Sequence, residues 1–299
     1  MDTSKLMFKP GLMKGQRILV TGGGTGLGKE MAEALLALGA DVYICGRRGD
    51  VLKETADELM KKHGGNMYPV PCDIRVADAI HDVVDEIWSA GPLTGLINNA
   101  AGNFISRTED LSPRGFEAIS NIVFKGSFFM TLDIGKRWIE QKIPGSVVSI
   151  LVTWVWTGGP FTVPSAMSKA GIDAMTKSLA VEWGRYGIRL NAIAPGAFPT
   201  EGMSARLAPG GRVSAERPAN ANPNSMARNG YMHELANLAT FLLAPGAEYL
   251  TGQHIAIDGA SHLGGGGFRN LADWTDEQWK AARESIQATN AADRAKRTV

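Results

Sequence analysis

The stretch Arg17-Ile-Leu-Val-Thr-Gly-Gly-Gly-Thr-Gly-Leu-Gly28 joins a short apolar run to a glycine-rich turn, and a segment of helical periodicity follows at residues 30–38. This order is typical of a first β-strand that leads to a helix N-terminus, where backbone N–H groups can approach the pyrophosphate of a dinucleotide. The glycine pattern alone is weak evidence, because a plain tight turn has the same composition. Its position directly after the first strand favours dinucleotide binding.

The same alternation of apolar runs and amphipathic segments continues along the chain. It predicts βαβ units and a parallel sheet covered by helices on both faces. The predicted strands are 17–20, 41–45, 67–72, 93–97, 146–151, 189–194 and 254–257. The predicted helices are 30–38, 50–62, 77–89, 113–140, 166–185 and 233–243. We therefore expect an α/β fold: a single doubly wound (Rossmann) domain over residues 1–299, with about seven parallel strands.

Two stretches interrupt this alternation. Residues 200–227 are polar and rich in proline, glycine and asparagine, which predicts a lid. Residues 265–299 form a tail in which Thr275-Asp-Glu-Gln278 has the pattern of a capping box, so we expect a helix to begin there.

Composition excludes several classes of partner. Lys plus Arg is 31 and Asp plus Glu is 30, and this balance argues against a nucleic-acid or membrane-surface partner. The two cysteines form no CxxC pair, so neither a metal site nor a redox disulfide is expected. The N-terminus lacks the pattern of a secretory signal, and the apolar runs are too short to cross a bilayer. We expect a soluble, cytoplasmic protein.

The residues after the second predicted strand bear on the cofactor. An acidic residue there would bind the ribose of NAD, whereas arginine suits the extra phosphate of NADP. The chain has Gly46-Arg47-Arg48, with no carboxylate before Asp50. A solvated basic loop is the alternative, but the planar guanidinium fits phosphate well. The sequence predicts NADP(H).

Four motifs in order resemble the short-chain dehydrogenase/reductase family, and the resemblance covers about residues 14–259. They are Thr21–Gly28, Cys72-Asp-Ile74, Asn98-Asn-Ala-Ala-Gly102 and Ala194-Pro-Gly196. Within the family the chain is most similar to the 2,4-dienoyl-CoA reductase group, through Asn98-Asn-Ala-Ala-Gly-Asn-Phe-Ile105, Phe161-Thr-Val-Pro-Ser-Ala166 and the tail that carries Trp279.

The resemblance implies a role for each matching position. Asp73 and Ile74 would flank the adenine, and Lys169 would bind the nicotinamide ribose. The implied cofactor-binding residues are Gly22, Thr25, Gly26, Leu27, Gly28, Arg47, Arg48, Asp73, Ile74, Asn99, Ala100, Gly102, Lys169, Pro195, Gly196 and Thr200. Family members associate through two long helices, here 113–140 and 166–185, so a homotetramer or homodimer is expected.

The catalytic set departs from the family pattern. The family at large places a tyrosine four residues before the lysine, where this chain has Ser165. The dienoyl-CoA reductase group also has serine there, and uses a loop tyrosine and a helix asparagine that fall on Trp154 and Lys125. Of the five tyrosines, only Tyr231, near the predicted lid, is a conceivable acid. The candidate catalytic residues are therefore Lys169, Lys125, Ser165 and Trp154.

Two of these candidates have ordinary alternatives. If Lys125 were desolvated between Phe124 and Phe128, its pKa would fall and it could stabilise a developing oxyanion. Otherwise it is a lysine that extends to solvent from a long helix. Trp154 and Trp156, with Phe161, would form an aromatic wall for an apolar substrate, although such clusters are often core.

Three functions remain open on the sequence. The first is an NADPH-dependent reductase of an unsaturated acyl thioester, such as an acyl-CoA. The second is a non-redox lyase, isomerase or hydrolase built on the same fold, and the third is a binding protein. Fold alone does not choose among them. Because the cofactor motifs are intact, we favour the reductase.

Overall fold

The computed structural model describes residues 1–200, 225–264 and 268–297. The chain divides into two compact units, Met1–His262 and Leu263–Val299. The first unit holds the sheet, its covering helices and the cavity described below. Of the predicted lid, residues 201–224 lie outside the described residues.

The first unit is built on a seven-stranded sheet with the order β3-β2-β1-β4-β5-β6-β7, and every neighbouring pair is parallel. The predicted doubly wound α/β fold is therefore confirmed. The strands are β1 (Arg17–Thr21), β2 (Asp41–Gly46), β3 (Met67–Pro71), β4 (Gly95–Asn98), β5 (Gly145–Ile150), β6 (Ile188–Pro195) and β7 (His254–Ile257).

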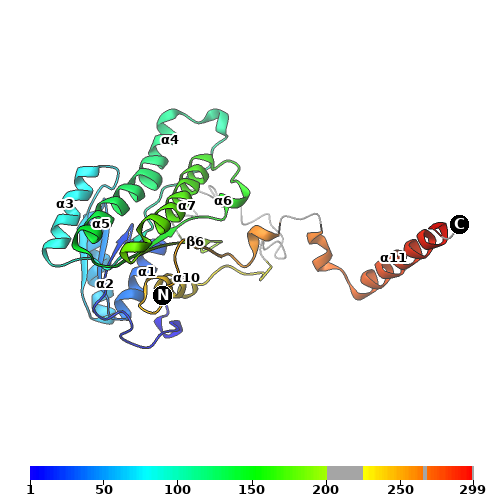
Figure 1. Cartoon of the computed structure of the whole chain (residues 1–299), viewed down its shortest axis with the longest axis horizontal. Helices are drawn as coiled ribbons and strands as arrows, with labels where there is room; N and C mark the ends of the chain where they lie inside the picture. The colour runs from blue at the N-terminus through cyan, green and yellow to red at the C-terminus, as the bar shows by residue number, and fades with distance from the viewer. Residues whose placement is uncertain (201–224, 265–267, 298–299) are drawn as a thin grey trace. The chain divides into compact units, whose positions relative to one another are not determined.

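Helices cover both faces of the sheet (Figure 1). One apolar core joins β1 to α1, α2 and α10, and the other joins it to α3, α5 and α7. The helices of the first unit are α1 (Gly26–Ala37), α2 (Gly49–His63), α3 (Ala77–Ser89), α4 (Pro113–Ser120), α5 (Ser127–Gln141), α6 (Trp154–Thr157), α7 (Val163–Trp183) and α10 (Met232–Leu243). Successive strands alternate with helices, and the order of strands reverses between β1 and β4, which places a crevice at their carboxyl ends.

Several helices differ from the sequence prediction. Helix α7 begins at Val163, three residues before the predicted start at 166, since Pro164 fits the first turn of a helix, and the sequence pattern does not predict the short helix α6. Helix α1 begins at Gly26 inside the glycine-rich turn, four residues before the predicted start, because glycine is a poor helix former and hides the first helical turn from the sequence pattern. The predicted helix 113–140 is not a regular α-helix throughout. A π-helical segment, Asn121–Gly126, separates α4 from α5. The helical turn is wider in this segment than in an α-helix. At its last residue, Gly126 passes Ile74 so closely that a Cβ at residue 126 would lie 2.8 Å from the isoleucine side chain.

The second unit contains helix α11 (Asp276–Arg297). Its start confirms the predicted capping box, since the Thr275 N–H donates to the Gln278 side chain at 2.8 Å and the Gln278 N–H donates to the Thr275 hydroxyl at 3.3 Å. Across the described ranges of both units, no helix is long and apolar enough to span a bilayer.

Candidate active site

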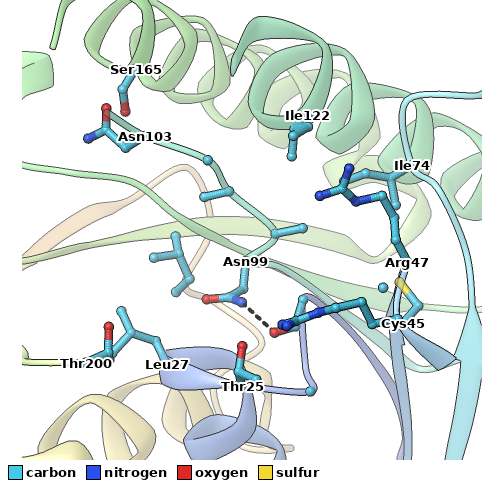
Figure 2. Close-up of a pocket in the computed structure, with 18 of the residues that line it drawn as sticks. Thr25, Leu27, Cys45, Arg47, Ile74, Asn99, Asn103, Ile122, Ser165 and Thr200 are labelled. Atoms are coloured by element: carbon cyan, nitrogen blue, oxygen red, sulfur yellow. Dashed lines mark hydrogen bonds between the residues drawn. The ribbon is translucent and has the colours of Figure 1, made fainter. Parts of the chain in front are cut away.

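A cavity of about 720 Å³ lies at the carboxyl ends of the strands in the first unit (Figure 2). It brings together most of the residues that the sequence predicted for cofactor binding or catalysis. Those that line it are Gly22, Thr25, Leu27, Arg47, Arg48, Asp73, Ile74, Asn99, Ala100, Gly102, Ser165, Lys169, Pro195, Gly196 and Thr200. Gly26 and Gly28 lie within the turn without lining the cavity, and Lys125 and Trp154 do not line it.

The glycine-rich turn has no room for larger side chains. Gly22 and Gly26 have positive φ angles of 66° and 56°, which residues with a Cβ rarely adopt. A Cβ at Gly28 would lie 2.3 Å from the carbonyl oxygen of Gly22 and 2.5 Å from the Asn99 side-chain nitrogen. The turn therefore packs closely against the start of α1, and its residues Gly22, Thr25 and Leu27 line the cavity at that helix N-terminus, where a pyrophosphate can bind.

Asn99 fixes this turn to the neighbouring strand. Its side-chain amide donates to the carbonyl oxygen of Gly22 at 3.3 Å (Figure 2) and to that of Thr21 at 3.0 Å. In return, the Thr21 hydroxyl accepts the backbone N–H groups of Asn99 and Ala100, each at 3.0 Å. The β1 turn and the segment after β4 thus form one connected floor for the cavity.

At the end of the cavity beside β2, charged groups of both signs meet. Arg47 and Arg48 follow β2 directly, and both are exposed. Asp73 is paired with Arg75, whose Nη2 lies 2.5 Å from the carboxylate. Hydrogen bonds from Arg75 hold the pKa of Asp73 below its usual value, and the charge of Arg47 acts in the same direction. This end therefore presents guanidinium groups to a ligand and keeps its carboxylate ionised.

Lys169 lies buried at the other end of the cavity. Its ammonium donates a hydrogen bond to the carbonyl oxygen of Ile150, the last residue of β5. Burial lowers the pKa of Lys169 to about 8. Ser165 lies one helical turn earlier on α7 and also lines the cavity. The i, i+4 spacing thus brings a hydroxyl and an amine to one face of α7.

Asn103 also lines the cavity, and the sequence analysis did not assign it a role. Figure 2 shows its side chain near Ser165 and away from Arg47. Its side-chain oxygen accepts the N–H of Phe104 at 2.9 Å, which leaves the NH₂ group as the donor toward the cavity. The sequence signal was its position directly after the Asn98–Gly102 turn, which carries the chain from β4 across the cavity.

The structure does not bring Lys125 or Trp154 to the cavity. Lys125 is exposed, so the described chain does not provide the desolvation that would activate it. Trp154 lies in the short helix α6 rather than in a loop, and its indole packs on Gly159, where a Cβ would lie 3.0 Å from the ring. Tyr231 is 57% exposed and stacks on His233. No tyrosine is among the described residues that line the cavity.

Comparison with known proteins assigns the family. Residues 22–262 match the family model described as enoyl-(acyl carrier protein) reductase. The chain is a short-chain dehydrogenase/reductase. It is an oxidoreductase of this type, and its relatives include several named 2,4-dienoyl-CoA reductases, in agreement with the resemblance found in the sequence.

Two relatives and one solved structure illustrate the similarity of this short-chain dehydrogenase/reductase to known proteins. A probable 2,4-dienoyl-CoA reductase 3 of Caenorhabditis elegans, (3E)-enoyl-CoA-producing, is 42% identical over 91% of this chain and 90% of the relative. A probable (2E)-enoyl-CoA-producing 2,4-dienoyl-CoA reductase of Bacillus subtilis is 40% identical over 84% of this chain and 98% of the relative. The citronellol catabolism dehydrogenase of Pseudomonas aeruginosa superposes with a TM-score of 0.74 at 34% identity, over 86% of this chain and 99% of that one.

Proposed function

We propose that this protein is an NADPH-dependent reductase of 2,4-dienoyl thioesters of coenzyme A. The observation that carries the proposal is that the amide of Asn103, the hydroxyl of Ser165 and the amine of Lys169 line one cavity. A thioester oxygen that gains negative charge is stabilised by such donors without a titrating phenol. Similarity to relatives named as 2,4-dienoyl-CoA reductases supports the same substrate class.

The residues present fit a nicotinamide dinucleotide. The turn that excludes a Cβ at Gly28 would hold the pyrophosphate at the N-terminus of α1, and Arg47 and Arg48 would bind the extra phosphate of NADP. Pro195, Gly196 and Thr200 would enclose the nicotinamide end. Bound in its reduced form, this cofactor supplies the hydride.

The chain's own groups act on the substrate. Asn103 and Ser165 would donate hydrogen bonds to the thioester oxygen, and Lys169 would hold the nicotinamide ribose while adding positive charge close by. Leu151 and Val152, which follow β5 directly, would give this part of the cavity an apolar wall that excludes water. Lys125 and Trp154, which the resemblance placed at the carbonyl, are not part of this proposal because neither lines the cavity.

The position of these donors bears on the product. Reduction at the far carbon of a 2,4-dienoyl thioester places negative charge on the thioester oxygen and on the carbon beside the carbonyl. A proton added to that carbon leaves the double bond between the third and fourth carbons. Because the donors would hold the carbonyl end, we expect the (3E)-enoyl product, as named for the nematode relative, rather than the (2E) product named for the bacterial one.

Incubation of the purified protein with NADPH and 2,4-hexadienoyl-CoA tests the proposal. We expect oxidation of NADPH, with the double bond of the product located by nuclear magnetic resonance. Turnover of 3-oxoacyl-CoA and simple ketones should be small, because Ser165 stands where a phenol would protonate a ketone oxygen. Ketone turnover that equals or exceeds dienoyl turnover would contradict the proposal.

Asn103→Ala should lower kcat/KM for the dienoyl thioester by about 10²–10³-fold, as expected for removal of one donor from an oxyanion site. Asn66→Ala is the matched control, since Asn66 contacts Asp41 outside the cavity and its loss should leave kcat/KM unchanged. Steady-state kinetics of Lys125→Ala test the competing assignment. If Lys125→Ala lost activity while Asn103→Ala kept a nearly normal kcat/KM, then Lys125, and not Asn103, would be the oxyanion donor.

Arg47→Ala should weaken NADPH binding by roughly 10–100-fold and leave NADH binding nearly unchanged, because a charge-assisted hydrogen bond to phosphate contributes about 1.5–3 kcal/mol. Isothermal titration calorimetry of both cofactors gives the two dissociation constants. Arg114→Ala is the control, since Arg114 is exposed on α4 and does not line the cavity. Equal affinity of the unchanged protein for NADPH and NADH would refute the assignment.

We also propose that the protein is a homotetramer or homodimer, and that it is cytoplasmic. Large apolar side chains are exposed along the π-helical segment, α5 and α7, namely Phe124, Phe128, Met167 and Val181. A symmetric contact between copies would remove them from water. Light scattering should therefore give a mass of two or four chains, and a species of only 31.9 kDa would refute the oligomer.

A further inference from the structure

An aromatic stack lies where helix α6 meets strand β7 and the turn that follows it. The indole of Trp156 stacks on the imidazole of His254, with 4.0 Å between ring centroids and 23° between planes. The same indole stacks on His262, with 4.8 Å between centroids and 30° between planes. One side chain of α6 thus contacts both the first residue of β7 and the short helix after its end.

Each histidine lies beside a carboxylate, but in different ways: His254 is fixed by burial and forms no hydrogen bond to Asp173, whereas His262 is within hydrogen-bonding distance of Asp258. The His254 side chain is 4% exposed, and its Nδ1 lies 3.2 Å from an oxygen of Asp173 on α7. The Nδ1 of His262 lies 2.8 Å from the carboxylate of Asp258, whose other oxygen accepts the N–H of Ala260 at 3.0 Å. The two imidazoles therefore present fixed surfaces to the indole.

The elements on both sides of the aromatic stack are adjacent to residues that line the cavity. Helix α6 begins two residues after Val152, and Leu151 and Val152 line the cavity. On the other side, the backbone of Asp258 packs against Gly196, where a Cβ would lie 2.7 Å from the Asp258 Cα atom. The stack thus connects the cavity residues that follow β5, Leu151 and Val152, to Gly196, the cavity residue that follows β6.

We propose that Trp156 is a positioning residue: by stacking on His254 at the start of β7 and on His262 after its end, it holds α6 in place and so fixes the substrate side of the cavity. Trp156 is 44% exposed, so much of its surface is not buried by packing. The substrate part of this inference rests on the proposed function, whereas the placement of α6 does not. Displacement of a wall by about 1 Å is enough to cost up to about 100-fold in rate.

Hydrogen exchange of the free protein tests the placement without any substrate. In Trp156→Ala, the backbone N–H groups of residues 150–165 should exchange about tenfold faster than in the unchanged protein, because α6 loses its anchor. Trp156→Phe keeps a stacking ring and should restore slow exchange. Trp279→Ala, in the second unit, is the control and should not alter exchange over these residues. Unchanged exchange in a folded Trp156→Ala protein would overturn the inference.

Kinetics then test the consequence for the substrate. Trp156→Ala should raise KM for 2,4-hexadienoyl-CoA by about tenfold, leave the NADPH dissociation constant within about twofold, and recover in Trp156→Phe. Faster exchange with an unchanged KM would overturn the role in substrate positioning. Absence of dienoyl-CoA turnover in the unchanged protein would refute the proposed function, while the exchange measurement would still decide whether Trp156 positions α6.

Discussion

Lys169→Met should lower kcat/KM for the dienoyl thioester by about 10²–10³-fold, the usual cost of removing one group that stabilises a developing oxyanion. Methionine keeps the length and apolar stem of the side chain, so the loss reports on the amine alone. Lys136→Met is the matched control, because Lys136 is exposed on α5 and does not line the cavity. Activity within threefold of the unchanged protein would exclude Lys169 from the catalytic set.

The pH dependence of the unchanged enzyme follows from the same residue. Burial lowers the pKa of Lys169 to about 8, so its ammonium is present below that pH and is lost above it. We expect kcat/KM to fall as the pH rises through about 8, since kcat/KM reports the ionisation of the free enzyme. A profile flat to pH 10 would contradict the assignment.

The same substitution should stabilise the fold. The pKa of Lys169 is about 8 when folded and near the ordinary 10.5 when unfolded, so at pH 7 folding carries an electrostatic cost of roughly 3 kcal/mol. The lost hydrogen bond to Ile150 offsets about 1 kcal/mol of the gain. Lys169→Met should therefore raise the free energy of unfolding by roughly 2 kcal/mol at pH 7. The advantage should shrink as the pH rises from 8 to 10.5, which urea titration at several pH values would measure.

The second large effect is expected at Gly28. A Cβ there would lie 2.3 Å from the Gly22 carbonyl oxygen, so Gly28→Ala must displace backbone rather than a flexible side chain. The displacement should cost about 1–3 kcal/mol of stability and reduce NADPH affinity by at least about tenfold, because the N–H groups of the turn would be misplaced. Calorimetry and thermal unfolding measure the two effects.

Gly184→Ala gives the matched control for Gly28→Ala. A Cβ at Gly184 would meet no atom within 4 Å, and its φ is an ordinary −53°. This variant should bind NADPH normally and unfold near the temperature of the unchanged protein. If Gly28→Ala bound NADPH with normal affinity, cofactor binding would not depend on the close approach of residue 28 to the Gly22 carbonyl oxygen.

The strands and the cofactor end of the cavity were predictable from the sequence because their signals are local. An apolar run such as Ile18–Val20 indicates a buried strand without knowledge of its neighbours. The glycines of the β1 turn, together with Arg47 after β2, lie at positions that the βαβ unit itself determines. The structure therefore places the predicted cofactor residues in or beside one cavity.

The catalytic end was less predictable because it depends on side-chain direction. The resemblance places Lys125 at the substrate carbonyl, within a helix that the sequence predicts to be regular, but the chain there is π-helical and the Lys125 side chain is exposed. Trp154 was expected on a loop, whereas α6 turns its indole onto Gly159. Asn103 follows a turn that no periodic pattern describes, so only the folded chain brings it to the cavity.

The order of strands also determines which strands another chain could pair with to extend the sheet. β3 is an edge strand, and edge strands can recruit a strand of another chain. The Cys72 N–H donates to the carbonyl oxygen of Gly46, and the Val42 N–H donates to the carbonyl oxygen of Asn66. These bonds show that the even-numbered residues along β3 direct their backbone N–H and C=O groups toward β2. The outward backbone positions therefore include Pro69 and Pro71, which have no N–H to offer. Pro69 and Pro71 therefore oppose extension of the sheet at β3 by a second copy, and this edge resists the pairing that leads to aggregation.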